Sequence, residues 1–154
     1  MKITKLPQVG HIGIVVENLE QSSAELKKLY DLDGLDTYYE FVPRRCWAWG
    51  TEIPDCKIRI CMVNWTDNLK LELLQPLSGN IEHARFLKKY AGGMHHSAYY
   101  VDDYDAYREF VLTLGYENIF ETETEDERGY RRCLYAALPQ TKMIIEILEN
   151  VKLK

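Results

Sequence analysis

Two histidines and two glutamates occupy matching places in two halves of this chain. The segment GHIGIVVEN around His11 has a counterpart in HHSAYYVDD around His96, and LELLQ around Glu72 has one in IEILE around Glu146. Each half therefore begins with a histidine strand and ends with a glutamate strand. Two imidazoles and two carboxylates form a ligand set typical of a divalent metal site. The repeat predicts a metal centre built from His11, Glu72, His96 and Glu146.

Both halves show the same order of elements, β-α-β-β-β, which predicts an α+β fold of two tandem βαβββ modules. In the first half, a strand around His11 precedes a helix that begins at Asn18 and is expected to end near Gly34. The first half is expected to continue with strands 37–42, 57–64 and 69–75. The second half is expected to contain strand 94–101, helix 103–114 and strands 118–124, 130–137 and 142–148.

We expect a single domain over residues 1–154, with module one at about 8–77 and module two at about 92–150. Residues 78–91 are predicted to form a linking helix between the modules. Residues 43–56 are the one irregular stretch and contain Trp47 and Trp49. A lid over a pocket and a loop folded over the edge of the core are both open interpretations of this stretch.

The alternation of strand side chains separates the glutamates from their neighbours. Leu71 and Leu73 point away from Glu72, and the isoleucines beside Glu146 likewise take the opposite face. Each opposite face is apolar enough to receive a helix. A carboxylate among aliphatic residues is costly to bury unless something compensates its charge, and a metal ion would do so.

Composition excludes several classes of function. The net charge of −5 comes without a basic block, so nucleic-acid binding has no electrostatic support. No apolar run approaches the roughly 18 residues that span a bilayer, and the N-terminus lacks the features of a secretory signal. We therefore expect a cytoplasmic protein with reduced cysteines and no nucleic-acid or membrane partner.

These residues and their order resemble the vicinal oxygen chelate superfamily, which includes glyoxalase I, bleomycin-resistance proteins and extradiol dioxygenases. The resemblance covers residues 9–149 and implies sheets that curl around one divalent metal ion. It also implies that the ligands are His11, Glu72, His96 and Glu146, and that the protein is a homodimer. The ligand types do not select among Co, Zn, Ni, Mn and Fe.

Within the superfamily the chain is most similar to the methylmalonyl-CoA epimerases. The similarity lies in LELLQPLS, in ARFL of the linking helix and in GGMHH before His96. It implies a small-molecule substrate such as an acyl-CoA thioester. A glyoxalase I-type lactoylglutathione lyase and a non-catalytic ligand-binding or resistance protein are the alternatives. Some epimerases carry a second catalytic glutamate where this chain has Arg59, which we expect to anchor a substrate carboxylate or phosphate, with a surface ion pair as the alternative.

The chemistry that such a site supports is proton abstraction next to a carbonyl, with the metal stabilising the enolate. Glu146 is our first choice for the catalytic base and Glu72 our second. Two further histidines are expected outside the centre. His95 should point to the face opposite His96 and serve there as a hydrogen-bonded residue behind the ligands or as a core residue, and His83 should lie on the surface of the linking helix.

Overall fold

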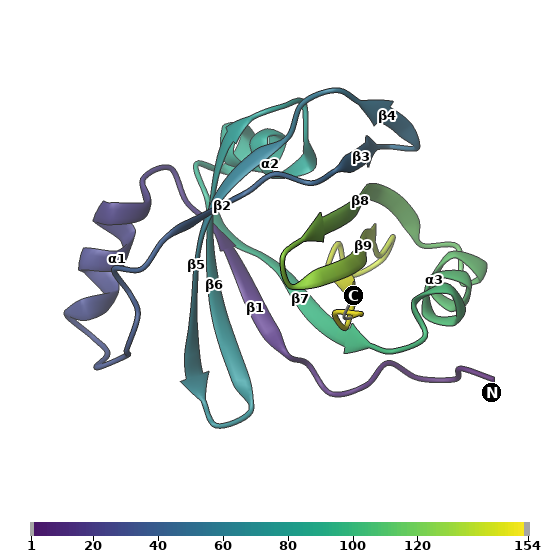
Figure 1. The fold of residues 1–154 in the computed structure, drawn as a ribbon, viewed down its shortest axis with the longest axis horizontal. Coiled ribbons are helices and arrows are strands. Elements are labelled where there is room, and N and C mark those ends of the chain that lie inside the picture. The colour runs from purple at the N-terminus through teal and green to yellow at the C-terminus, as the bar shows by residue number, and fades with distance from the viewer. Residues whose placement is uncertain (1, 153–154) are drawn as a thin grey trace.

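One continuous, curved sheet contains all ten strands of residues 2–152, the part of the chain that the computed structural model describes (Figure 1). The strands lie in the order β2-β5-β6-β1-β7-β10-β9-β8-β3-β4. The first module contains β1 (His11–Val15), α1 (Leu19–Lys27), β2 (Tyr39–Phe41), β3 (Arg45–Ala48), β4 (Thr51–Ile53), β5 (Lys57–Thr66) and β6 (Leu69–Ser78). The linking helix is α2 (Glu82–Tyr90), and it leads into β7 (Gly93–Val101), α3 (Tyr104–Thr113), β8 (Glu117–Asp126), β9 (Gly129–Ala137) and β10 (Ile144–Glu149).

The two modules repeat one pairing plan. The first strand of each pairs in parallel with the last, β1 with β6 and β7 with β10, and the middle strands add antiparallel neighbours outward. The modules join where β1 and β7 run antiparallel. The predicted α+β class with paired βαβββ units is confirmed, and the four strands β6, β1, β7 and β10 lie side by side at the centre of the sheet.

Residues 43–56 are not irregular, as the sequence suggested, but contain the β3–β4 hairpin. Trp49 and Gly50 both have positive φ, of 49° and 79°, which matches the two-residue turns that suit the twist of a hairpin. Strand β3 pairs with β8 of the other module. The first module therefore covers the outer edge of the second, a contact between distant segments that local sequence patterns do not indicate.

Helices α1 and α3 pack on the outer face of the sheet, one over each module (Figure 1). Leu71 and Leu73 share a buried cluster with Leu19 of α1, whereas Ile145 and Ile147 share one with α3. The predicted separation of these side chains from the glutamates is confirmed. A third cluster, on the inner face, surrounds the cavity described below.

Two helix boundaries differ from expectation. Helix α1 begins after Asn18, whose side chain accepts a hydrogen bond from the Gln21 N–H, but it ends at Lys27 because the chain then turns so that Leu35 packs beneath the helix. Helix α2 begins only at Glu82, since β6 continues to Ser78. No helix within residues 2–152 is long and apolar enough to cross a membrane.

Candidate metal centre

The four predicted ligands meet on the inner face of the four central strands. His11 is the first residue of β1, Glu72 lies in β6, His96 in β7 and Glu146 in β10. Gly13 of β1 stands opposite both Glu72 and His96 in the sheet register. A side chain at Gly13 would collide with the His96 ring, so the glycine makes room for the imidazole to lie over the strand.

The donor atoms of these residues converge on one point. The Nε2 atom of His11 lies 3.4 Å from Glu72 Oε1 and 3.1 Å from Glu146 Oε2. The corresponding distances from His96 Nε2 are 3.4 Å and 3.2 Å, and the two Nε2 atoms are 3.2 Å apart. All four donor atoms lie within 4.8 Å of one another, and all four residues are buried.

In this centre, burial and the attraction between imidazoles and carboxylates shift the pKa of each group in opposite directions. Burial lowers the pKa of His11, but the Glu72 and Glu146 carboxylates raise it to about 12, and they also raise the pKa of His96. Burial raises the pKa of both glutamates, yet the imidazoles bring it below the usual range. Protons on the imidazoles neutralise the carboxylates, and a bound cation would replace those protons.

The donor set fits a divalent cation. Glu72 Oε1 and Glu146 Oε2 are buried without a hydrogen-bond partner, although each faces both imidazoles. The Nδ1 atoms of the two histidines face other partners, so once the Nε2 atoms lose their protons, their lone pairs point at the carboxylates. Four electron-pair donors that converge in a buried space repel one another unless a cation lies among them.

Each histidine is held from behind. His11 Nδ1 lies 2.7 Å from the hydroxyl of Tyr100, whose ring occupies the space that a side chain at Gly10 would need. His96 Nδ1 lies 2.9 Å from Nδ1 of His95, which in turn is hydrogen-bonded to Glu82 of α2. Partners of this kind fix the orientation of a metal-binding imidazole.

For the other two histidines, the expected face of His95 and the expected exposure of His83 were wrong, whereas the buried, hydrogen-bonded character expected of His95 is confirmed. His95 is buried on the same side as His96, because a bulge in the β1–β7 pairing leaves it without a partner residue in the register. His83 is fully buried rather than exposed, and its ring stacks on that of His95 with centroids 4.7 Å apart. Helix α2 carries His83 under the sheet, a placement that depends on packing between distant elements.

The two glutamates line a cavity of about 110 Å³. Part of its lining is apolar, formed by Ile58, Ile60, Leu74, Phe120 and Leu148, and part is polar, including Thr122, Thr124 and Tyr135. Three arginines also line it: Arg128 and Arg131, which are both paired with Asp126 at 3.1 Å, and Arg132, which is paired with Glu149. Arg128 and Arg131 bring two positive charges to the single carboxylate of Asp126. This side of the cavity is therefore suited to an anion. Of the described residues lining the cavity, Glu72 and Glu146 supply the carboxylates.

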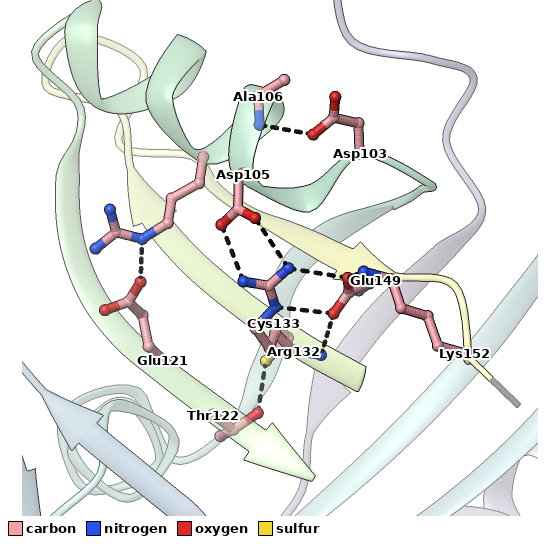
Figure 2. A network of polar contacts seen from close by, with 10 residues as sticks. Asp103, Asp105, Ala106, Glu121, Thr122, Arg132, Cys133, Glu149 and Lys152 are labelled. Atoms are coloured by element: carbon pink, nitrogen blue, oxygen red, sulfur yellow. Dashed lines mark hydrogen bonds and ion pairs between the residues drawn. The ribbon is translucent and has the colours of Figure 1, made fainter. Parts of the chain in front are cut away.

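Arg59 does not line this cavity. It lies on the outer face of β5, forms an ion pair with Glu20 of α1 and stacks over Tyr38. The second module has the same arrangement, in which Arg132 pairs with Asp105 of α3 (Figure 2) and stacks over Tyr104. Arg59 therefore forms a surface ion pair, which was the alternative to a substrate anchor. The reason is the register of β5 on β6, which directs the Arg59 side chain to the face opposite Glu72.

Several residues around the site were not singled out from the sequence. Tyr100 lies four residues beyond His96 on the same strand and therefore shares its face, which is a signal that the sequence contains. Arg131 similarly shares the face of Cys133 and Tyr135. Glu82 had no such signal, since its contact depends on how α2 docks against β7.

Comparison with known proteins agrees with this geometry. The model of the Glyoxalase/Bleomycin resistance protein/Dioxygenase superfamily matches residues 10–135. The chain belongs to this superfamily. Its predicted membership, made from the repeat and the four ligand positions, is confirmed.

Methylmalonyl-CoA epimerases occur among both the relatives and the solved structures that match this chain. The human mitochondrial methylmalonyl-CoA epimerase is 32% identical over 105 residues, which covers 68% of this chain and 52% of that protein; the bovine enzyme is 32% identical over 102 residues, covering 66% and 50%. The chain thus spans about half the length of the curated relatives it matches.

Among solved structures, methylmalonyl-CoA epimerase from Mycobacterium tuberculosis has a TM-score of 0.65 at 21% identity, covering 99% of this chain and 94% of that one. The Streptomyces coelicolor enzyme in complex with 2-nitronate-propionyl-CoA has a TM-score of 0.64 at 18% identity, covering 96% and 100%. At these identities the structural matches establish the fold.

Proposed function

We propose that this protein is a metal-dependent epimerase that moves a proton on the carbon next to a thioester carbonyl, as methylmalonyl-CoA epimerases do. The observation that carries the proposal is the convergence of His11, Glu72, His96 and Glu146 donor atoms within 4.8 Å in a buried cavity. The 32% identity to mammalian methylmalonyl-CoA epimerases supports the choice of reaction. Co, Zn, Ni, Mn and Fe all suit this donor set.

These four residues would hold one divalent cation. When bound, the cation would stabilise the negative charge that develops on the carbonyl oxygen as the neighbouring carbon loses its proton. The apolar side chains that line part of the cavity lower the local dielectric, which would strengthen that electrostatic effect.

Proton transfer falls to the two glutamates. Glu146 and Glu72 come from opposite modules, and each turns one carboxylate oxygen toward the imidazoles. The second oxygen of the same carboxylate can accept or return a proton. We assign removal of the proton to Glu146 and its return on the other face of the carbon to Glu72. Arg59 takes no part, since it is paired with Glu20 on the outer face.

An anionic thioester suits the rest of the cavity. At about 110 Å³ it matches a short acyl group and not a whole coenzyme, since sites for drug-sized ligands are about 300–1,000 Å³. Arg131 and Arg128 would attract a carboxylate or phosphate of the substrate as it enters. The Streptomyces coelicolor relative was solved with an acyl-CoA analogue, which supports this class of substrate. The homodimer and the cytoplasmic location stay predictions.

Two measurements test the proposal. Untagged protein should contain about one equivalent of transition metal after reloading, and it should exchange the α-proton of methylmalonyl-CoA in deuterated water. Less than about half an equivalent of metal contradicts the metal centre. Metal-loaded protein without exchange, but with turnover of a hemithioacetal, moves the assignment to a glyoxalase I-type lyase. Absence of both reactions leaves a ligand-binding protein.

A further inference from the structure

A chain of buried polar contacts runs from His96 away from the metal centre. The Nδ1 atoms of His96 and His95 are 2.9 Å apart, and Nε2 of His95 is hydrogen-bonded to Oε2 of Glu82. The side chains of both histidines are fully buried, and that of Glu82 is 13% exposed. Solvent therefore competes little for these contacts, and the groups must satisfy one another.

The contacts allow one distribution of protons when Nε2 of His96 binds a metal. A neutral imidazole that coordinates through Nε2 carries its proton on Nδ1. Only one of two facing Nδ1 atoms can hold a proton, so His95 accepts at Nδ1 and carries its own proton on Nε2. That proton is then donated to the Glu82 carboxylate. Each donor in the chain meets one acceptor.

The local fold explains why two successive histidines share one side of a strand. In the β1–β7 pairing, Gly13 stands opposite His96 and Ile14 opposite Met94, so His95 is skipped. A bulged residue of this kind can redirect its side chain. His95 is thereby placed against α2, whose first residue is Glu82.

The ring of His83 provides a contrast on the same helix. It stacks on His95 at 4.7 Å between centroids, yet neither of its ring nitrogens has a hydrogen-bond partner. Its contacts are with rings, including those of Phe120 and Tyr135. His83 thus packs against the chain of contacts without belonging to it.

We propose that Glu82 and His95 are positioning residues that hold His96 as the Nδ1–H tautomer and increase its affinity for the metal ion. This inference rests on the proposed four-residue metal centre. A carboxylate at the end of the chain makes His95 a better acceptor, which in turn increases the basicity of His96 Nε2. Loss of such outer partners reduces metal affinity by about 10- to 100-fold in other metal sites.

The test compares Co²⁺ affinity, measured by competition with a chelator, in the full chain and three variants. Glu82→Ala should weaken Co²⁺ binding by about 10- to 100-fold. Glu82→Gln retains an acceptor without the charge and should fall between Glu82→Ala and the wild type. His83→Phe keeps the stacked ring and serves as the matched control, with affinity within about threefold of the wild type. Thermal unfolding of each variant shows that it is folded.

A second readout separates positioning from general packing. Nitrogen NMR of the diamagnetic Zn²⁺-loaded protein should show His96 protonated at Nδ1 and His95 at Nε2. Equal Co²⁺ affinity in Glu82→Ala and His83→Phe, or the opposite tautomer at His95, would overturn this inference while leaving the metal centre intact. Wild-type protein that takes up no metal overturns the proposed function, and this inference with it.

Discussion

The two modules carry equivalent histidines at the proposed metal centre but support them differently. In the first, His11 is backed by the neutral hydroxyl of Tyr100, whereas His96 in the second is backed by His95 and the Glu82 carboxylate. The repeat therefore conserves the atoms that face the centre and varies those behind them. An anionic partner strengthens a ligand more than a neutral one does, so the two halves of the centre are expected to be unequal.

A second pair of equivalent positions shows the same division. Gln75 and Glu149 lie three residues after Glu72 and Glu146 in the matching strands β6 and β10, and both contribute to attaching the outer helices. Gln75 accepts a hydrogen bond from the backbone N–H of Leu19, whereas Glu149 binds Arg132, which also pairs with Asp105 of α3 (Figure 2). The first module uses a neutral contact where the second uses a buried ion pair.

The largest expected effect concerns the two glutamates of the centre. Glu146→Gln should reduce α-proton exchange of methylmalonyl-CoA by about 10³-fold, because an amide cannot take up the proton. Glu72→Gln should cost less, since Glu72 is assigned the return of the proton and not its removal. Metal content and exchange rate are measured for both variants. A greater loss in Glu72→Gln than in Glu146→Gln would reverse the assignment of the base.

The two equivalent arginines should differ strongly in their effect on stability. Arg132→Ala leaves the fully buried Glu149 side chain with Lys152 as its remaining cation and should lower the free energy of unfolding by about 3 kcal/mol. Arg59→Ala removes an ion pair with Glu20, which is 54% exposed, and should cost no more than about 1 kcal/mol. Denaturant unfolding compares them. Equal losses would contradict the proposed difference between the modules.

The same ion pair predicts a dependence of stability on pH. Burial raises the pKa of Glu149, but Arg132 and Lys152 lower it overall. A lowered pKa in the folded state stabilises the protein above the unfolded value of about 4.3, and this contribution is lost as pH falls through the folded value. The free energy of unfolding should therefore decrease as the pH is lowered below about 4.5. The drop should be shallower in Glu149→Gln, and identical profiles for variant and wild type would contradict this contribution.

A smaller effect, on substrate affinity, is expected from replacing Arg131, an arginine of the second module that lines the cavity. Arg131 lies where the first module has an apolar residue, Ile58, at the equivalent inner position of its strand. Arg131→Gln should raise KM for an acyl-CoA thioester about tenfold with little change in kcat. Arg44→Gln removes an exposed guanidinium that is paired with Glu125 and serves as the control. Unchanged KM in Arg131→Gln would exclude an anchoring role.

The smallest expected effect tests the neutral support of His11. Tyr100→Phe removes one hydrogen bond and should weaken Co²⁺ binding by about threefold to tenfold, which corresponds to about 1 kcal/mol. Chelator competition under the conditions used for Glu82→Ala provides the comparison. A larger loss in Tyr100→Phe than in Glu82→Ala would mean that the first module holds the stronger ligand.

The sequence determined the paired modules and the four residues that converge. Alternation along a strand is a local property, so the positions of His11 and His96 and the faces of Glu72 and Glu146 could be predicted from spacing alone. The apolar residues beside the glutamates likewise predicted where the outer helices would pack. These features depend only on neighbours in the chain and on a repeat that can be compared with itself.

Tertiary structure alone decided the contacts between segments that are distant in the chain. The register of β5 on β6 sent Arg59 outward, the β1–β7 bulge turned His95 toward Glu82, and the docking of α2 buried His83. The β3–β4 hairpin also joined the sheet of the other module. Register, bulges and docking arise from the packing of whole elements against each other, and no local pattern in the sequence records them.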